Sequence, residues 1–294
     1  MKSYIVVAVL LASASPVWAD ALEGKASSAE ILENSAPTDW RKLDPENTLY
    51  IELERGRVIV ALSTQLAQNH VAQVKALARE GFYDGLSFYR VIDGFVAQGG
   101  DVFEKREIKT AEKVMKAEFD QPLTDDIRFA AMKEADGYAA HVGFVDTIPA
   151  GVDEDRKTIW HLHCPGAFAF GRGNEKDTAS TEFYIALQPQ RYLDRNLTVF
   201  GRVVQGMEHL QGLRRVAPAQ SEDDDTGETI IAMRVAADVP EEDREALEIL
   251  DSSTETFTAY VESRRNRPEE FFHFRHNYID VCQLPVPVRA APGE

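Results

Sequence analysis

The sequence predicts a mainly β fold: a closed antiparallel β-barrel of about eight strands, capped by two helices and followed by a helical extension. Between residues 47 and 239, most segments are short and alternate apolar with polar residues. Apart from an insertion described below, only two segments there have helical features, one after Ala67 and one starting near Gly206. Many strands with two helices fit a closed barrel whose ends the helices cover.

The N-terminal end has the pattern of a secretory signal peptide. Lys2 precedes an apolar run over residues 4–14, and small residues surround Val17-Trp18-Ala19. We expect residues 1–19 to be removed after Ala19 and the mature protein to be periplasmic or secreted. The run is too short to span a bilayer, which argues against an uncleaved anchor, so we expect no membrane span in the mature protein.

Composition limits the classes of partner. The chain has 49 acidic and 32 basic residues, for a formal net charge of −17. Such an excess of negative charge makes nucleic acid an unfavourable partner. With 44% hydrophobic residues the chain can bury a full core, and its length fits one domain with additions. We expect a monomer.

The first elements follow from local patterns. Residues 20–46 read as an N-terminal arm with a short helix over residues 28–33. Alternating apolar residues over 49–53 and 58–62 predict a β-hairpin. A helix follows from Ala67, and Gly81 supplies its left-handed stop.

The next strand carries an arginine in an apolar run. Alternation places Phe88, Arg90 and Ile92 on one face, with Tyr89 and Val91 on the other. An arginine in such surroundings needs a partner or a function. Pairing with a carboxylate at a strand edge is the structural alternative.

Two ordered groups of motifs resemble the cyclophilins, a family of peptidyl-prolyl isomerases. Phe88-Tyr89-Arg90, Gly94-Phe95-Val96 and Gln98-Gly99-Gly100-Asp101 are similar to the family's Phe-His-Arg, Gly-Phe-Met and Gln-Gly-Gly-Asp. The second group consists of Ser180-Thr-Glu-Phe-Tyr-Ile185, Tyr192-Leu-Asp194 and Val199-Phe-Gly201. These three are similar, in the same order, to the family's Ser-Gln-Phe-Phe-Ile, Trp-Leu-Asp and Val-Phe-Gly. The resemblance covers residues 47–239 and implies a cyclophilin-like barrel.

Two segments lie outside this resemblance. Residues 122–165 form an insertion, in which 125–136 is weakly helical; connections of this length are usually functional or pinned. Residues 240–294 form the C-terminal extension, where Pro240 and Pro268, each followed by acidic residues, predict two helices. The apolar stripes of these helices would cover the barrel or the insertion, or alternatively form a surface for a partner protein.

The two cysteines, Cys164 and Cys282, allow two interpretations. In an exported protein they can form a disulfide that ties the insertion to the extension, or they can be separate buried thiols. The histidines of 161–163 and 273–276, with Cys164, could also supply metal ligands, but their spacing fits no closed zinc pattern. We therefore expect neither a metal nor a cofactor.

The resemblance also implies the roles of individual residues. Arg90, Phe95 and Gln98 would be catalytic, with the guanidinium stabilising the twisted amide of a proline-containing polypeptide. The residues expected to bind substrate are Val96, Gly171, Arg172, Glu182, Tyr184, Tyr192, Leu193 and Leu197. Gly171 and Arg172 would offer backbone hydrogen bonds to the peptide.

Several of these positions depart from the family pattern. Val96 stands for methionine, Glu182 for glutamine, Tyr184 for phenylalanine, Tyr192 for tryptophan and Leu197 for histidine. Glu182 is the departure of most consequence, because an ion pair with Arg90 would occupy donors needed by the substrate, so that Glu182→Gln would raise the isomerisation rate. The alternative function is a catalytically weak cyclophilin-like module that binds proline-containing peptides or acts as a chaperone.

Overall fold

The computed structural model describes residues 25–218, 221 and 226–292. The predicted signal peptide, residues 1–19, lies outside the described residues. Within the described part of the chain, no helix combines the length and apolar character needed to cross a membrane.

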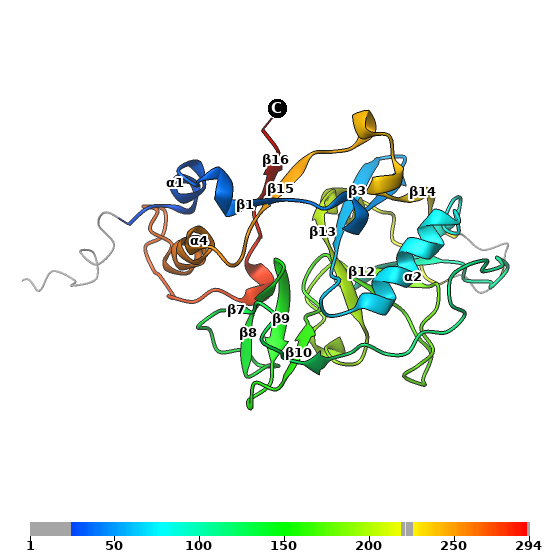
Figure 1. The fold of residues 1–294 in the computed structure, drawn as a ribbon, viewed down its shortest axis with the longest axis horizontal. Helices are drawn as coiled ribbons and strands as arrows, with labels where there is room; N and C mark the ends of the chain where they lie inside the picture. Colours follow the sequence, from blue (N-terminus) through cyan, green and yellow to red (C-terminus); the bar gives the residue numbers. More distant parts are fainter. Residues whose placement is uncertain (1–24, 219–220, 222–225, 293–294) are drawn as a thin grey trace, which may run out of the picture.

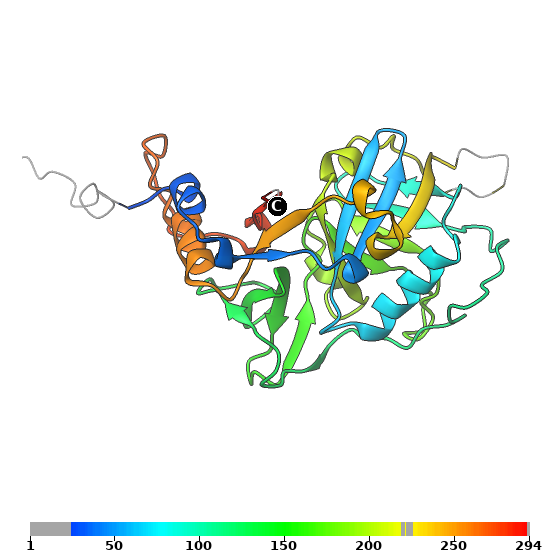
Figure 2. The ribbon, with the colours of Figure 1, turned by 45° about the horizontal axis from the view of Figure 1, so that its top comes forward.

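A closed antiparallel barrel of eight strands forms the main body, which confirms the predicted fold class (Figures 1 and 2). Around the barrel the strand order is β11-β12-β5-β4-β14-β2-β3-β13. The strands are β2 (Thr48–Leu53), β3 (Gly56–Leu62), β4 (Ser87–Val91), β5 (Val96–Gly100), β11 (Ala167–Phe170), β12 (Phe183–Ala186), β13 (Val199–Gln205) and β14 (Glu228–Val235). As expected, β2 and β3 form a hairpin.

Aromatic side chains fill the barrel, and two helices lie against it. Phe88, Phe168, Phe183 and Phe200 are fully buried, and their rings contact one another mostly edge to face. Helices α2 (Gln68–Arg79) and α3 (Met207–Gln211) occupy the predicted positions. Helix α2 buries an apolar stripe in the same core, and Gly81 follows it with a φ of +69°.

The N-terminal arm, the insertion and the extension together build a second body beside the barrel (Figure 2). The insertion forms a sheet in the order β6-β10-β9-β8-β7, with β6 (Gln121–Pro122), β7 (Ala130–Ala131), β8 (His141–Val145), β9 (Ile148–Val152) and β10 (Thr158–His161). A second sheet, β1-β15-β16, joins β1 (Trp40–Lys42) of the arm to β15 (Leu247–Leu250) and β16 (Val288–Ala290) of the extension. Helices α1 (Ser28–Glu33) and α4 (Glu255–Asn266) complete this body.

These three segments share one hydrophobic core and a covalent link. Phe144 and Trp160 of the insertion pack in one cluster with Phe257 and Tyr260 of the extension. A disulfide joins Cys164 to Cys282 across 118 residues of sequence. Short 3-10 helices lie between the larger elements, at Pro37–Asp39, Pro45–Asn47, Arg191–Leu193, Ala236–Asp238, Glu241–Asp243 and Val281–Gln283.

The helical expectations for the insertion and the extension are largely wrong, because pairing with distant strands overrides local preference. Residues 125–136 are extended where β7 pairs with β8. The helix expected from Pro240 ends after one 3-10 turn, and β15 then pairs with β1 and β16. Residues 267–280 contain no helix, so only α4 of the extension is an α-helix.

Candidate active site

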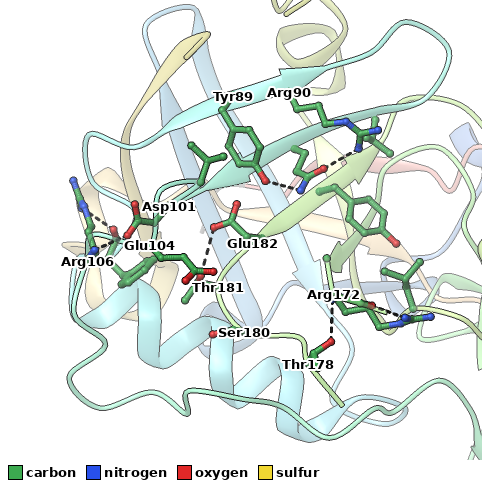
Figure 3. Close-up of a pocket in the computed structure, with 18 of the residues that line it drawn as sticks. Tyr89, Arg90, Asp101, Glu104, Arg106, Arg172, Thr178, Ser180, Thr181 and Glu182 are labelled. Carbon is green, nitrogen blue, oxygen red and sulfur yellow. Dashed lines mark hydrogen bonds between the residues drawn. The ribbon is translucent and has the colours of Figure 1, made fainter. Parts of the chain in front are cut away.

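A cavity of about 980 Å³ opens on one flank of the barrel (Figure 3). Its walls come from β4, β5 and β12, the 3-10 helix Arg191–Leu193 and the segment 101–113. The predicted residues that line it are Arg90, Phe95, Val96, Gln98, Gly171, Arg172, Glu182, Tyr184, Leu193 and Leu197. Tyr192 is not among the lining residues, and 58% of its surface is exposed.

A β-bulge turns Arg90 toward this cavity. The pairing of β4 with β5 shifts by one residue between Ser87 and Arg90. Phe88 consequently packs inside the barrel, while Tyr89 and Arg90 both line the cavity. The expectation that Phe88 and Arg90 share a face is therefore wrong, because simple alternation does not survive an extra residue in one strand.

Neighbouring side chains hold the Arg90 guanidinium in place. Arg90 Nη1 donates to Gln98 Oε1 at 2.9 Å, and Gln98 Nε2 donates to the Tyr89 hydroxyl at 2.6 Å. The guanidinium carbon lies 5.2 Å from the centre of the Phe95 ring, a cation–π distance. No carboxylate among the described residues forms an ion pair with Arg90, so its other N–H groups remain available to a substrate.

Beside the guanidinium lies an apolar cluster separate from the barrel core. Val96, Tyr184 and Val199 form it with Ala167, Ala169 and Ala186, and Phe95 and Leu197 pack against it. Phe95, Val96, Tyr184 and Leu197 line the cavity, and the apolar cup that they form suits a proline ring, which is apolar and has no N–H to satisfy.

The Tyr184 hydroxyl leaves this cup apolar because it is bonded to a buried histidine. Its oxygen lies 2.9 Å from His163 Nε2, and His163 Nδ1 lies 3.0 Å from Asp194 Oδ1. Since a carboxylate can only accept, Nδ1 donates to Asp194, and Nε2 is the ring nitrogen that faces the Tyr184 hydroxyl. Burial, reinforced by the Asp194 carboxylate, raises the pKa of Tyr184, which stays a phenol.

The chain of contacts continues into the insertion. Arg191 Nε donates to Asp194 Oδ2 at 2.6 Å, and Arg191 Nη1 donates to Asp136 Oδ2 at 2.7 Å. All three of these side chains are at most 7% exposed. The sequence indicates His163 only as a possible metal ligand, and Arg191 and Asp136 were not expected at the site. The position of His163 next to an apolar strand was the one sequence signal for this network, because the partners of His163 are distant in sequence.

Glu182 does not form the expected ion pair with Arg90. Figure 3 shows Arg90 linked through Gln98 to Tyr89, with the Glu182 carboxylate lying on the Tyr89 side. Thr181 Oγ1 donates weakly to Glu182 Oε1 at 3.5 Å, while Oε2 is buried without a hydrogen-bond partner. Burial raises the pKa of Glu182 to about 7, although the Tyr89 side chain and a backbone hydrogen bond from Asp101 oppose the rise.

The glycine at position 100 makes room for this carboxyl group. Its φ is +143°, and a Cβ there would lie 2.4 Å from Glu182 Oε1. Only a residue without a side chain fits at this distance and in this backbone conformation.

At the other side of the cavity, the contacts of Gly171 and Arg172 differ in part from expectation. The Gly171 N–H donates to the Glu182 carbonyl at 2.6 Å, so this group is not free to bind a peptide. The Arg172 side chain binds its own loop through Nη1, which donates to the Gly173 carbonyl at 2.7 Å, and Nε donates to the Asn196 carbonyl at 2.8 Å. Further wall residues, not expected from the sequence, are Asp101, Glu104, Arg106, Ile108, Thr178 and Ser180.

The residues considered as metal ligands near the insertion have other partners. His161 Nε2 lies 2.6 Å from Ser63 Oγ, and burial lowers the pKa of His161 to about 4. His163 binds Tyr184 and Asp194, and Cys164 is in the disulfide.

Comparisons with known proteins agree with this architecture. The sequence model of the family described as "Cyclophilin type peptidyl-prolyl cis-trans isomerase/CLD" matches residues 48–235. A probable peptidyl-prolyl cis-trans isomerase of Brucella suis is 30% identical over 200 residues, which cover 66% of this chain and 85% of the relative. Peptidyl-prolyl cis-trans isomerase B of Bacillus subtilis is 31% identical over 167 residues, covering 56% of this chain and 90% of that protein.

One solved structure is similar to this chain over more residues than the family model matches. The cyclophilin AquaCyp293 from Hirschia baltica superposes with a TM-score of 0.70 at 24% identity, covering 86% of this chain and 95% of that one. The shared architecture thus includes much of the second body as well as the barrel.

Proposed function

This chain belongs to the cyclophilin family and is a peptidyl-prolyl cis-trans isomerase, and we propose that it serves exported proteins through stabilisation of a twisted amide by Arg90. The single observation that carries the mechanism is the position of this guanidinium: fixed by Gln98, free of carboxylates and next to the apolar cup.

The barrier to the reaction comes from amide resonance. A planar prolyl bond resists rotation by about 18–20 kcal/mol. In the twisted state the resonance is lost, and the prolyl nitrogen has a lone pair that can accept a hydrogen bond. A donor aimed at this nitrogen stabilises the twisted state more than either planar state, which is the requirement for catalysis.

Each part of the site has a role in this mechanism. The cup around Tyr184 holds the proline ring while the preceding residue rotates. Gln98 accepts a hydrogen bond from Arg90 and thereby fixes the plane of the guanidinium. Arginine suits the task because it stays charged and presents several donors in one plane. The step requires no covalent intermediate and no proton transfer.

Two features support action on exported proteins. The N-terminal sequence has the charge, apolar run and small residues of a leader that would be cut after Ala19. The Cys164–Cys282 disulfide suits an oxidising compartment. Cell fractionation with N-terminal sequencing tests this proposal. A mature protein in the periplasm or medium that begins at Asp20 would support it, and an unprocessed cytoplasmic protein would refute it.

The mechanism is tested with Arg90→Ala and Arg90→Lys in a protease-free isomerisation assay on an Xaa-Pro peptide. Removing a donor to the transition state typically costs about 100-fold or more. We expect that loss in kcat/KM for Arg90→Ala, and only partial rescue by lysine, which lacks the planar fork. Arg195→Ala is the matched control, because Arg195 pairs with Asp120 at the surface. If Arg90→Ala retains activity close to that of the control, the arginine mechanism is wrong.

A second function, the binding of unfolded polypeptides independently of turnover, is favoured by exposed aromatic residues in the extension. Phe271 and Phe274 are 83% and 73% exposed. If this surface binds clients, Arg90→Ala should still suppress aggregation of a denatured protein, whereas the double change Phe271→Ser and Phe274→Ser should abolish that effect. Unaltered suppression in the double variant would exclude these two residues as the binding surface.

A further inference from the structure

A second cavity, of about 380 Å³, is lined by residues of β13 in the barrel and of β15 and β16 in the second body. Its walls come from the barrel, the insertion, helix α4 and the segment that follows Cys282. It shares no lining residue with the catalytic cavity. A ligand here would therefore occupy a separate site.

The charge lining this cavity is entirely positive. Arg202 and Arg264 line it, and no aspartate or glutamate does. This arrangement is unusual for a chain in which acidic residues outnumber basic ones by 49 to 32.

Neither guanidinium has an ionic partner among the residues that the structure describes. Arg202 makes one long hydrogen bond, from Nη1 to the Thr147 carbonyl at 3.4 Å. Arg264 Nε is buried with no acceptor. The next residue of the same helix is in a different situation, because Arg265 pairs with both Glu134 and Glu262. The missing partners are thus a property of this cavity and not of the helix.

Both arginines are partly buried, and a charge withdrawn from water is costly unless something compensates it. Burial lowers the pKa of Arg202 to about 10, which leaves it charged at neutral pH. Nearby Tyr260 offers no negative charge, because burial raises its pKa and its hydroxyl donates to the Pro285 carbonyl at 2.8 Å. An anion between the two arginines would supply the compensation that the protein does not.

The remaining walls indicate what else the anion must carry. They are mostly apolar, and include Ile148, Val203, Met207, Ile249, Leu284 and Val286. The volume falls within the range of small-molecule sites. We propose that this cavity binds a small organic carboxylate, with the carboxylate between Arg202 and Arg264 and a short aliphatic part against the apolar walls. Arginine forks match carboxylate geometry, and the apolar walls favour such a ligand over inorganic phosphate.

Calorimetric titration of the full chain tests the proposal, with hexanoate, hexanol and inorganic phosphate as probes. Hexanoate should bind saturably and raise the melting temperature with concentration. Hexanol lacks the charge and phosphate lacks the apolar part, so each should bind at least about tenfold more weakly. Equal binding of hexanol or phosphate, or no binding of hexanoate, would overturn the assignment.

Variants locate the binding. Arg202→Met and Arg264→Met should each weaken hexanoate binding at least about tenfold. Arg202→Met should not lower the melting temperature of the unliganded protein, since it removes an uncompensated charge. Arg215→Met is the control, because Arg215 is at the surface and pairs with Asp93. Isomerisation of a short peptide should be unchanged in all three, which shows that they are folded. Should Arg202→Met fail to fold, Arg264→Met decides alone, and unchanged hexanoate affinity in it would refute the site.

Discussion

Replacement of Glu182 by glutamine gives a direct measure of the electrostatics of the catalytic cavity. Glutamine keeps the shape of the side chain and removes its ionisation. In the folded protein, burial raises the pKa of Glu182 to about 7, against an ordinary value of 4.5. The folded state therefore holds its proton more tightly than the unfolded state does.

The sign of the pH dependence follows from this difference. Below about pH 4.5 both states are protonated, so the carboxyl carries no ionic penalty. As the pH rises from about 4.5 to about 7, the unfolded state is ionised while the folded state still holds its proton, so the stability of the wild type falls. The difference of about 2.5 in pKa corresponds to a loss of about 3 kcal/mol, complete near pH 8.

Urea unfolding of wild type and Glu182→Gln at about pH 4 and pH 8 tests this account. We expect nearly equal free energies of unfolding at the lower pH, and a variant that is more stable by about 3 kcal/mol at the higher one. A difference that does not change with pH would refute the raised pKa.

The same variant tests the contact between Glu182 and Arg90. Because the structure contains no ion pair between them, we expect kcat/KM for a short peptide to change little. A large increase would show that the pair forms in solution, as the sequence alone suggested, and that the arrangement in Figure 3 is not the one that limits turnover.

Other substitutions test the surroundings of the cup. His163→Ala should raise KM with little effect on kcat, because it loosens the Tyr184 ring, which contacts the proline equally in the ground state and the transition state. The effect on KM should be smaller when Tyr184→Phe is already present, and additive effects of the two substitutions would contradict this. Cys282→Ser should lower the free energy of unfolding by about 4–5 kcal/mol in the chain-entropy model, a loss that reductant should reproduce in the wild type alone. Arg191→Ala should destabilise by about 3–5 kcal/mol because it leaves buried carboxylates unpaired, whereas the exposed Arg195→Ala should cost less than about 1 kcal/mol; equal losses in thermal unfolding would be inconsistent with a buried network.

The barrel could be predicted from sequence because its signals are local. Alternating apolar residues over 49–62 specify a hairpin whose two strands are also neighbours in the chain. The helix after Ala67 and its stop at Gly81 depend on residues within a few positions of each other. The short arm helix over 28–33 matches the structure for the same reason, since Ser27 and Glu30 form a capping box.

The second body could not be predicted because its signals are not local. Leu247 and Leu250 are spaced as on a helix, but Leu250 pairs with Trp40, more than 200 residues away. The formation of such a strand depends on pairing with a distant segment, and the sequence of that segment does not indicate the pairing. The bulge before Arg90 is a similar case, because the extra residue is visible only once β4 is aligned with β5.

The buried network connects the insertion to residues of the catalytic site. His163 and Cys164 are consecutive residues with opposite attachments: the first supports the Tyr184 ring at the floor of the cup, and the second is bonded to Cys282 of the extension. The extension and the proline cup are therefore joined through two adjacent residues of the insertion. The substitution of tyrosine for the family's phenylalanine at position 184 fits this arrangement, because only a hydroxyl gives the insertion a hydrogen bond to the cup.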